Sequence, residues 1–400
     1  MKILLVTQYF CPENFKSNDI AFELTKRGHS VTVITGIPNY PSGKYFKGYG
    51  IFTKRKEIIN GVKIIRSFLI PRGNGSGIRL AANYLSWAFF ASIRVIFHTL
   101  FNKYDIILGH EPSPITQGIP CVIAKKLCKA PLYFWVLDLW PESLSSAGGV
   151  SNKQVLNFFL KITRFVYNHS DKILISSRGF AESILEKGNY AEKIIYFPNW
   201  AEDIFNSGNT YRIPDLPDGF RIIYAGNIGE AQDMDNIMQA ALLLKKEKEI
   251  KFIFVGEGRK KPFLESFIRE HDLKNTVFLM GRYPLEAMPS FFAASDVMLL
   301  ALKDAMIFNV TVPAKLQAYM AAKKPVAAML NGEGASIISE AKCGFSTKAG
   351  DCKGLAGIIV KLKQMSVPER VSLGENGRNY FEKNFSLDKC INHLCKIIKE

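Results

Sequence analysis

The clearest hydrophobic pattern in the chain lies in its second half. A run of apolar residues at 222–225 ends in the glycine-rich segment 226–229, and a helical repeat of apolar positions follows over residues 237–244. A second apolar run, residues 252–255, ends in the turn at residues 256–258. Strand, glycine turn, helix and strand in this order predict a parallel βαβ unit.

The same alternation fills the first half. Apolar runs separated by helical patterns predict strands near residues 1–6, 31–35, 62–66, 105–109, 132–137 and 172–177. Four hundred residues exceed what one core usually holds, so we expect an α/β protein with two doubly wound, Rossmann-like domains. The polar, proline-containing segment 206–219 is the predicted linker. The expected domains are residues 1–205 and 206–380, with a final helix, residues 381–400, that packs back on the first domain.

The glycine-rich segment is a candidate phosphate site. Glycines let the backbone approach a phosphate closely, and the amides that open the next helix attract anions. A nucleotide diphosphate fits such a site, and Glu257 is placed to accept hydrogen bonds from a base or ribose. Ordinary turn chemistry explains the same glycines, so the motif alone leaves both interpretations open. The candidate ligand-binding residues here are Gly226, Asn227, Ile228, Gly229, Glu257 and Gly258.

A second candidate anion site lies near Pro313, which stands in the first turn of another predicted helix. Proline is favoured at that position, and a helix N-terminus offers free amides to an anion. Asn309, Thr311 and Lys315 surround this helix start.

The cysteine pattern indicates a reduced protein. Seven cysteines form neither a CxxC pair nor a Cys/His cluster with zinc spacing, and their odd number argues against a disulfide framework. The N-terminal strand lacks the long apolar core of a signal peptide. We therefore expect a cytosolic protein.

Positive charge is concentrated in the first half. Residues 1–200 hold 25 Lys and Arg against 12 Asp and Glu, whereas residues 201–400 hold 27 against 24. The most basic stretch, residues 44–79, contains a single acidic residue, Glu57. The basic surface therefore belongs to the first domain.

An apolar, aromatic-rich helical segment, residues 78–93, follows this basic stretch. Such a combination indicates contact with an anionic membrane surface. Arg79, Arg94 and His98 bracket an apolar stretch shorter than the roughly 20 residues of a membrane span, so we expect the helix to lie in the interface. A buried core helix with a solvated basic flank is the alternative. Nucleic acid is the least favoured partner, because no nucleic-acid-binding module is recognisable.

Eight short motifs stand in register along the whole chain: RGHSVTV (27–33), NYP (39–41), DLWPE (138–142), FPNW (197–200), YAGNIG (224–229), VGEG (255–258), VPAKLQ (312–317) and GR (377–378). Together they resemble the family-four retaining glycosyltransferases of the GT-B fold. The chain is most similar to bacterial O-antigen and capsule enzymes that use UDP-N-acetyl-L-fucosamine. The resemblance implies two Rossmann-like domains that face each other across a cleft, with the UDP-sugar held by the second.

One departure from the family concerns the donor ribose. The wider family carries a Glu-x7-Glu pair whose second Glu holds the ribose, and these positions fall at Val310 and Ala318 here. The fucosamine-type branch looks similar at this helix. The resemblance therefore implies that ribose contacts pass to Glu257, Lys315 or Gln317.

In a retaining transferase of this fold, preorganised donors must stabilise the departing β-phosphate. The resemblance assigns this task to the amides of residues 226–229 and 309–312, together with Lys315 and Arg282, without a metal ion. Asp233 and Asp235 look like a metal-binding DxD motif, but they stand at a helix start, where Asp is favoured as a cap. We therefore expect no bound metal and no cofactor, with the UDP-sugar as donor substrate.

Three residues of the first domain are candidates for catalysis at the acceptor. Asp138 follows a strand and falls where relatives contact acceptor and sugar, and Glu142 lies one helical turn further on. Either carboxylate would accept or orient the proton of the acceptor hydroxyl; the alternatives are a helix cap and a structural carboxylate. His110, beside Glu111 at the end of another strand, is the third candidate.

The resemblance and the basic apolar helix together predict a peripheral glycosyltransferase at the cytoplasmic face of the inner membrane. It would transfer a sugar, N-acetyl-L-fucosamine, from UDP to an undecaprenyl-diphosphate-linked sugar in capsule or O-antigen repeat-unit synthesis. A UDP-sugar 2-epimerase and a non-catalytic membrane-bound partner of a polysaccharide-synthesis complex are the alternatives. The apolar helix disfavours the epimerase, and the intact glycine segment disfavours the non-catalytic partner.

Overall fold

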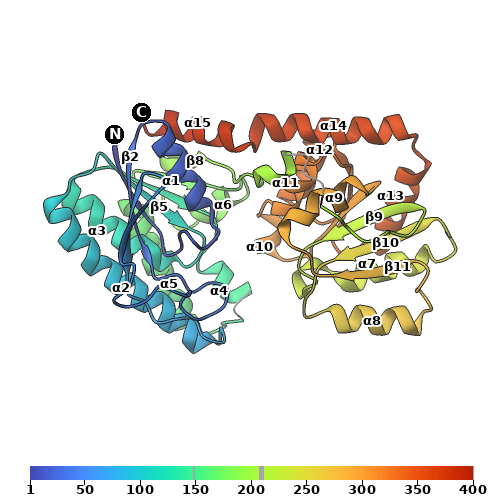
Figure 1. Cartoon of the computed structure of the whole chain (residues 1–400), viewed down its shortest axis with the longest axis horizontal. Coiled ribbons are helices and arrows are strands. Elements are labelled where there is room, and N and C mark those ends of the chain that lie inside the picture. Colours follow the sequence, from blue (N-terminus) through green and yellow to red (C-terminus); the bar gives the residue numbers. More distant parts are fainter. Residues whose placement is uncertain (147–148, 207–210, 400) are drawn as a thin grey trace. The chain divides into compact units, whose positions relative to one another are not determined.

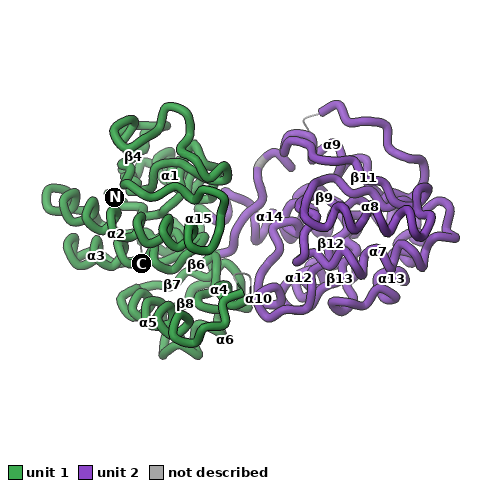
Figure 2. Tube along the Cα trace, turned by 90° about the horizontal axis from the view of Figure 1, so that it is seen from below, with its two compact units in different colours: residues 1–197, 391–400 green, residues 198–390 purple. Residues whose placement is uncertain are grey.

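The computed structural model describes residues 1–146, 149–206 and 211–399, and the chain divides into two compact units (Figure 2). The N-terminal unit comprises residues 1–197 and 391–400, and the C-terminal unit comprises residues 198–390. The division at 197 precedes the predicted boundary at 205, and the returning segment begins ten residues later than the predicted 381. Residues 207–210 of the predicted linker lie outside the described part.

The N-terminal unit is built on a sheet with the strand order β3-β4-β2-β1-β5-β6-β7-β8, parallel except for β3. Its strands are β1 (Lys2–Val6), β2 (Ser30–Gly36), β3 (Lys56–Ile59), β4 (Val62–Ser67), β5 (Ile106–Glu111), β6 (Leu132–Val136), β7 (Lys172–Ile175) and β8 (Ile194–Tyr196). The central strands are almost wholly buried, which explains their continuous apolar runs. The two edge strands, β3 and β8, are short and partly exposed, and neither is among the predicted strands.

Helices flank this sheet, and α2 packs against α3 and against β2 and β4 (Figure 1). The helices of the unit are α1 (Lys16–Lys26), α2 (Gly77–Phe101), η1 (Ile115–Gln117), α3 (Gly118–Cys128), α4 (Glu142–Ser146), α5 (Lys153–His169), α6 (Phe180–Leu185) and η2 (Ala191–Lys193). The last helix, α15 (Leu387–Ile397), ends in this unit.

The C-terminal unit holds a fully parallel sheet with the order β11-β10-β9-β12-β13-β14. Its strands are β9 (Phe220–Ala225), β10 (Ile250–Val255), β11 (Val277–Gly281), β12 (Val297–Ala301), β13 (Val326–Met329) and β14 (Gly344–Thr347). Its helices are η3 (Asp203–Asn206), η4 (Glu230–Gln232), α7 (Met234–Leu243), α8 (Lys261–Glu270), η5 (Leu285–Ala287), α9 (Met288–Ala293), α10 (Met306–Asn309), α11 (Ala314–Ala321), α12 (Glu333–Ala341), α13 (Cys352–Gln364) and α14 (Val367–Asn384). The predicted βαβ unit is β9, α7 and β10, which confirms that prediction.

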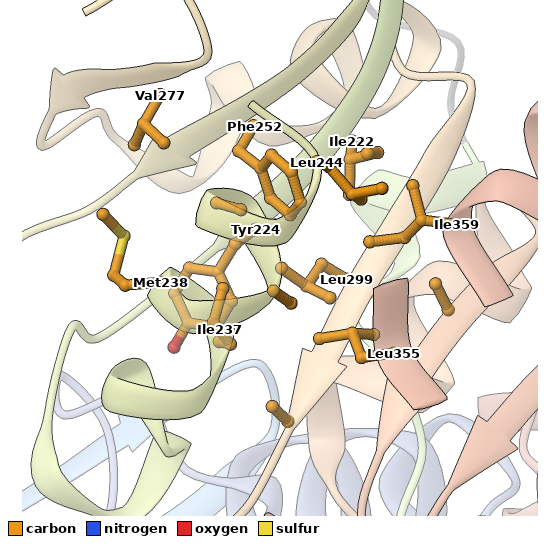
Figure 3. Packing of buried hydrophobic residues seen from close by; sticks show 14 of the residues in the cluster. Ile222, Tyr224, Ile237, Met238, Leu244, Phe252, Val277, Leu299, Leu355 and Ile359 are labelled. Atoms are coloured by element: carbon orange, nitrogen blue, oxygen red, sulfur yellow. The ribbon is translucent and has the colours of Figure 1, made fainter. Parts of the chain in front are cut away.

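Two apolar clusters hold the C-terminal sheet, one on each face. On one face, Tyr224 and Phe252 of neighbouring strands pack against Ile237 of α7 and against Leu355 and Ile359 of α13 (Figure 3). Burial of a large apolar side chain stabilises the fold by roughly 1.5–3 kcal/mol. The cluster therefore anchors the strand that precedes the glycine-rich segment.

Two helix starts in this unit differ in how they are capped. The Asp351 carboxylate accepts a hydrogen bond from the Gly354 N–H at 2.8 Å and so caps α13. Asp233, predicted as the cap of α7, makes no cap hydrogen bond and accepts instead from the Asn236 side chain at 3.0 Å. The carboxylate of Asp235 pairs with Lys260 at 3.0 Å.

Candidate active site

Two glycine turns meet at the carboxyl ends of β9 and β10. Gly226 has φ +133° and Gly256 has φ +153°, a region that residues with a Cβ rarely adopt. A Cβ on Gly256 would lie 1.9 Å from the Gly226 carbonyl oxygen. The glycines are therefore required for the two turns to approach each other.

A cavity of about 380 Å³ opens at these turns. Four predicted ligand-binding residues line it, Gly226, Asn227, Glu257 and Arg282, and the structure adds Val255, Gly256, Tyr283 and Met288. The volume falls in the range of small-molecule sites. Gly258 lies just outside, packed so closely that a Cβ there would be 2.1 Å from the Ile228 carbonyl oxygen.

The amides of the glycine-rich segment are largely engaged within the protein. The Gly226 N–H donates to Val255 O at 2.8 Å, and the Ile228 N–H donates to Glu257 O at 2.9 Å. The Gly229 N–H donates to the Gln232 side chain at 3.2 Å. As they lie here, these three amides are not free to hold a phosphate, contrary to the simple expectation for a glycine turn. An anion at this turn needs another source of positive charge.

Lys315 supplies a positive charge beside the turn. Its Nζ donates to the Tyr224 hydroxyl at 2.6 Å and lies 4.4 Å from the centre of that ring. No carboxylate lies within 4.0 Å of this ammonium in the described part of the chain. Burial lowers the pKa of Lys315 to about 8. The Tyr224 hydroxyl in turn donates to the Asn227 carbonyl, so one tyrosine joins the lysine to the turn.

Tyr224 is a candidate site residue that the sequence did not single out. It stands in a buried apolar run, where a tyrosine is easily taken for a core residue. Its position as the first residue of the YAGNIG motif, directly before Ala225 and Gly226 at the end of the strand, is the signal that would have marked it.

Other predicted residues of this unit are held by internal contacts. The Glu257 carboxylate pairs with Lys261 at 2.6 Å and stays partly exposed. Asn309 donates to Asp304 at 2.9 Å, and the Thr311 hydroxyl donates to Ile307 O at 2.6 Å.

Gln317 is placed differently from its predicted role. Its side chain is buried, and its Nε2 donates to Asn199 O at 2.8 Å. The amide thus ties the segment after residue 198 to α11. A ribose contact from Gln317 does not fit this arrangement.

In the N-terminal unit, Asp138 follows β6 and is largely buried. The Ser143 hydroxyl donates to its carboxylate. Burial raises the pKa of Asp138 despite this bond. A carboxylate with a raised pKa is suited to exchange a proton with a substrate hydroxyl.

Glu142 belongs to a different environment. Its Oε1 accepts hydrogen bonds from Ser183, at 2.8 Å, and from the buried ammonium of Lys187. It also lines a hollow of about 270 Å³ together with Arg164 and Leu160. The ion pair with Lys187 matches the structural carboxylate that the sequence analysis left open.

His110 lies in the core of the N-terminal unit. Its Nδ1 is 3.0 Å from the Thr7 hydroxyl, and its ring packs near Trp135. Burial lowers the pKa of His110 to about 3, so the ring is neutral, and burial raises the pKa of the adjacent Glu111. With no exposed surface, His110 does not fit the predicted role at the acceptor.

The apolar helix α2 is longer than predicted, with 25 residues, and is long and apolar enough to cross a membrane by length and composition alone. Its inner side, which includes Trp87 and Val95, is buried in the core. Its opposite side exposes large apolar residues: Ile78, Leu85, Phe89, Phe90, Ile93, Ile96, Phe97, Leu100 and Phe101. We call these nine residues the outer face of α2. The core interpretation therefore holds for one side of the helix, and Trp87 is not exposed to a membrane.

No group of three or more His, Cys, Asp or Glu side chains suited to a metal ion occurs among residues 1–146, 149–206 and 211–399.

Comparisons with known proteins place these features in a family. Residues 17–200 match the glycosyl transferase 4-like domain, and residues 213–380 match the glycosyl transferases group 1 family. Both halves of the chain thus match glycosyltransferase models, and these matches support a glycosyltransferase of group 1. The chain is 29% identical over 338 residues to a protein of Pseudomonas aeruginosa named "Probable glycosyltransferase WbjE", covering 80% of each chain. It is 24% identical over 219 residues to the amylovoran biosynthesis glycosyltransferase AmsK of Erwinia amylovora, covering 54% of this chain and 53% of AmsK.

Solved structures establish the fold of this glycosyltransferase as GT-B. The Anabaena protein Alr3699/HepE in complex with UDP aligns over the full length of both chains, with a TM-score of 0.68 and 15% identity. WaaG, a glycosyltransferase involved in lipopolysaccharide biosynthesis, aligns over 100% of this chain and 99% of its own, with a TM-score of 0.67 and 15% identity. The predicted fold is confirmed.

Proposed function

We propose that this glycosyltransferase transfers a sugar from a UDP-sugar to an undecaprenyl-diphosphate-linked sugar during assembly of a bacterial surface polysaccharide. N-acetyl-L-fucosamine is the proposed sugar, and capsule or O-antigen repeat units are the proposed products. The named role of AmsK in amylovoran biosynthesis supports a polysaccharide pathway, and the UDP bound to HepE supports a UDP donor.

The observation that carries the proposal is the ammonium of Lys315 beside the glycine turn at Gly226, which has no carboxylate within 4.0 Å among the described residues. A UDP-sugar brings a diphosphate, and cleavage of its sugar–phosphate bond increases the negative charge on the β-phosphate. A fixed cation in a poorly solvated site stabilises that charge as it develops. Lys315 would hold the diphosphate, while Glu257 and Arg282 would contact the nucleoside within the cavity.

We further propose that the reaction retains the anomeric configuration and needs no metal ion. Lys315 provides the charge compensation that a divalent cation provides in other transferases. EDTA should therefore leave transfer largely intact. Abolition by EDTA with rescue by Mn²⁺ would contradict this and would make Asp233 and Asp235 candidate ligands.

The proposed location is the cytoplasmic face of the inner membrane, with the outer face of α2 in the interface. The exposed aromatic residues Phe89 and Phe97 suit the headgroup region of a membrane. The basic stretch 44–79, which runs into this helix, suits anionic lipids. A peripheral enzyme placed in this way meets a lipid-linked acceptor without extracting it from the membrane.

The function is tested with a panel of UDP-sugars and a synthetic polyprenyl-diphosphate-linked sugar in anionic vesicles. We expect one UDP-sugar to raise the melting temperature most and to be consumed only when the acceptor is present. NMR of the product would show whether the new linkage keeps the donor's anomeric configuration. Epimerisation of the UDP-sugar without acceptor would contradict the proposal.

A further inference from the structure

Arg72 lies in a frame of tyrosine side chains in the N-terminal unit. Its guanidinium carbon is 5.0 Å from the ring centre of Tyr40 and 5.8 Å from that of Tyr84. Its two terminal nitrogens donate long hydrogen bonds, 3.4 and 3.5 Å, to the hydroxyls of Tyr9 and Tyr84. Across the described ranges, no carboxylate lies within 4.0 Å of this guanidinium. A partly buried cation here thus has aromatic neighbours but no counter-ion.

The frame is held by the backbone around it. The buried carboxylate of Glu13 accepts hydrogen bonds from the N–H groups of Asn39, at 2.8 Å, and Tyr40, at 2.7 Å. The Asn39 side-chain oxygen accepts from the Arg72 N–H at 3.2 Å. The loops that carry Tyr40 and Arg72 are therefore fixed to each other before any ligand arrives, which lowers the entropic cost of binding.

The tyrosine hydroxyls are suited to an anion. Burial raises the pKa of Tyr9 and of Tyr84, so both hydroxyls remain protonated at neutral pH and can donate hydrogen bonds. The charge of Asp138 also raises the pKa of Tyr84, which shows that this carboxylate lies within electrostatic reach. Tyr84 is on α2, directly before Leu85 of the outer face. The frame is thus within electrostatic reach of the candidate acceptor carboxylate and shares helix α2 with the apolar outer face.

We propose that Arg72, Tyr9, Tyr40 and Tyr84 bind the diphosphate of a lipid-linked acceptor. Arginine is suited to phosphate oxygens because its planar donors bind them in pairs. A lipid-linked acceptor has an apolar chain, a diphosphate and a sugar in that order. The N-terminal unit holds a group suited to each part: the outer face of α2 for the chain, Arg72 for the diphosphate and Asp138 for the sugar hydroxyl. The assignment rests on the proposed function, since it names the acceptor group that the transferase would recognise.

Direct binding tests this site without relying on transfer. The full-length protein, saturated with UDP to block the donor site, is titrated with farnesyl diphosphate and with farnesol in a calorimeter. We expect Arg72→Gln to weaken farnesyl diphosphate binding about 10- to 100-fold and to leave farnesol binding unchanged. Arg27→Gln is the matched control, because Arg27 is in the same unit but is paired with Glu23. Equal affinities for wild type and Arg72→Gln, or an equal loss in Arg27→Gln, would overturn the proposal.

Two further measurements cover the remaining outcomes. Tyr84→Phe keeps the ring and removes one hydroxyl, so it should weaken farnesyl diphosphate binding by a few-fold even if Arg72→Gln fails to fold; an unchanged affinity would contradict the site. Octyl glucuronide, which carries its negative charge on the sugar and has no diphosphate, is the second probe. If Arg72→Gln weakens the binding of octyl glucuronide but not the binding of farnesyl diphosphate, the diphosphate assignment is wrong. Farnesyl diphosphate binding that depends on Arg72, in a protein that transfers no sugar, would overturn the proposed function and leave this site standing.

Discussion

Each unit of the protein holds a cation that rests on tyrosine and lacks a carboxylate partner in the described structure, yet the two cations differ in chemistry. Lys315 in the C-terminal unit donates to Tyr224, and burial lowers its pKa to about 8. Arg72 in the N-terminal unit lies over Tyr40 and Tyr84, and guanidinium groups in proteins are not deprotonated. We therefore expect ligand binding to depend on pH at the C-terminal cation and not at the N-terminal one. The pH dependence of ligand binding can therefore distinguish the proposed donor site from the proposed acceptor site.

The largest expected effect comes from Asp138, which the proposal assigns to the acceptor side. Asp138→Asn keeps the size of the side chain and its contact with Ser143, but removes the proton acceptor. Loss of a general base typically lowers turnover by about 10²- to 10⁴-fold, so kcat should fall by at least about 100-fold while the Kd for UDP stays the same. A parallel loss of UDP affinity would contradict the assignment. Glu142→Gln provides the contrast: its main expected effect is a lower melting temperature, because it breaks the pair with Lys187.

Lys315→Gln tests the donor side of the comparison. The substitution keeps a polar chain near Tyr224 but removes the charge, and a hydrogen bond to a charged group contributes about 1.5–3 kcal/mol. We expect UDP to bind roughly 10- to 100-fold more weakly and turnover to fall as well, because the leaving group is less stabilised. Lys361→Gln is the control, since this lysine also lies over an aromatic ring, that of Phe345, in the same unit. If Lys315→Gln leaves the affinity for UDP unchanged, Lys315 does not hold the diphosphate, and the amides of the glycine turn become the candidate phosphate-binding groups again.

The two units should also differ in their affinity for membranes, because the outer face of α2 belongs to the N-terminal unit. Phe89→Ser combined with Phe97→Ser should reduce binding to anionic vesicles about tenfold and leave the melting temperature within a few degrees, because both rings are exposed. Val367→Ser with Val371→Ser, equally exposed on α14, is the matched control and should not change vesicle binding. Trp87→Ser should instead destabilise the fold strongly, because this ring is fully buried. Unaltered vesicle binding by the phenylalanine variant would exclude the outer face as the membrane contact.

Hydrophobic periodicity predicted most strands and the placement of Asp138, Glu257 and Lys315 near strand ends or a helix start. Those positions follow from local pattern alone. Periodicity did not mark the contact between Tyr224 and Lys315, which are 91 residues apart and meet only through the order of strands in the sheet. It also did not show that the Gln232 side chain accepts a hydrogen bond from the Gly229 N–H, because that contact depends on a side-chain rotamer.

The helix α2 shows a second limit of sequence patterns. It is apolar nearly all round, so its hydrophobic positions do not reveal which side faces the core. Trp87 and Phe89 are therefore indistinguishable by pattern, although one is fully buried and the other is mostly exposed. The packing of α2 against α3, β2 and β4 decides between them.

The smallest expected effect is the pH dependence of UDP binding, and it bears most directly on the comparison. Lys315 is charged below its pKa of about 8 and loses its proton above it. A bound diphosphate favours the charged form, so the complex keeps its proton to higher pH than the free protein. The Kd for UDP should therefore rise about 3- to 10-fold between pH 7.5 and 9, with proton uptake on binding at the higher pH. Farnesyl diphosphate binding at Arg72 should not change over this range.

Unfolding does not explain such a loss, because the stability effect of Lys315 has the opposite sign. In the unfolded chain a lysine titrates near 10.4, so between about pH 8 and 10 the unfolded state binds more protons than the folded state. The contribution of Lys315 to stability therefore rises with pH in this window, whereas UDP affinity falls. Calorimetry in buffers of different ionisation enthalpy measures the proton uptake, and Lys315→Gln removes it while preserving any ionisation of UDP itself. A pH dependence that persists in Lys315→Gln would mean that the pH-sensitive charge lies elsewhere, and the contrast between Lys315 and Arg72 would no longer hold.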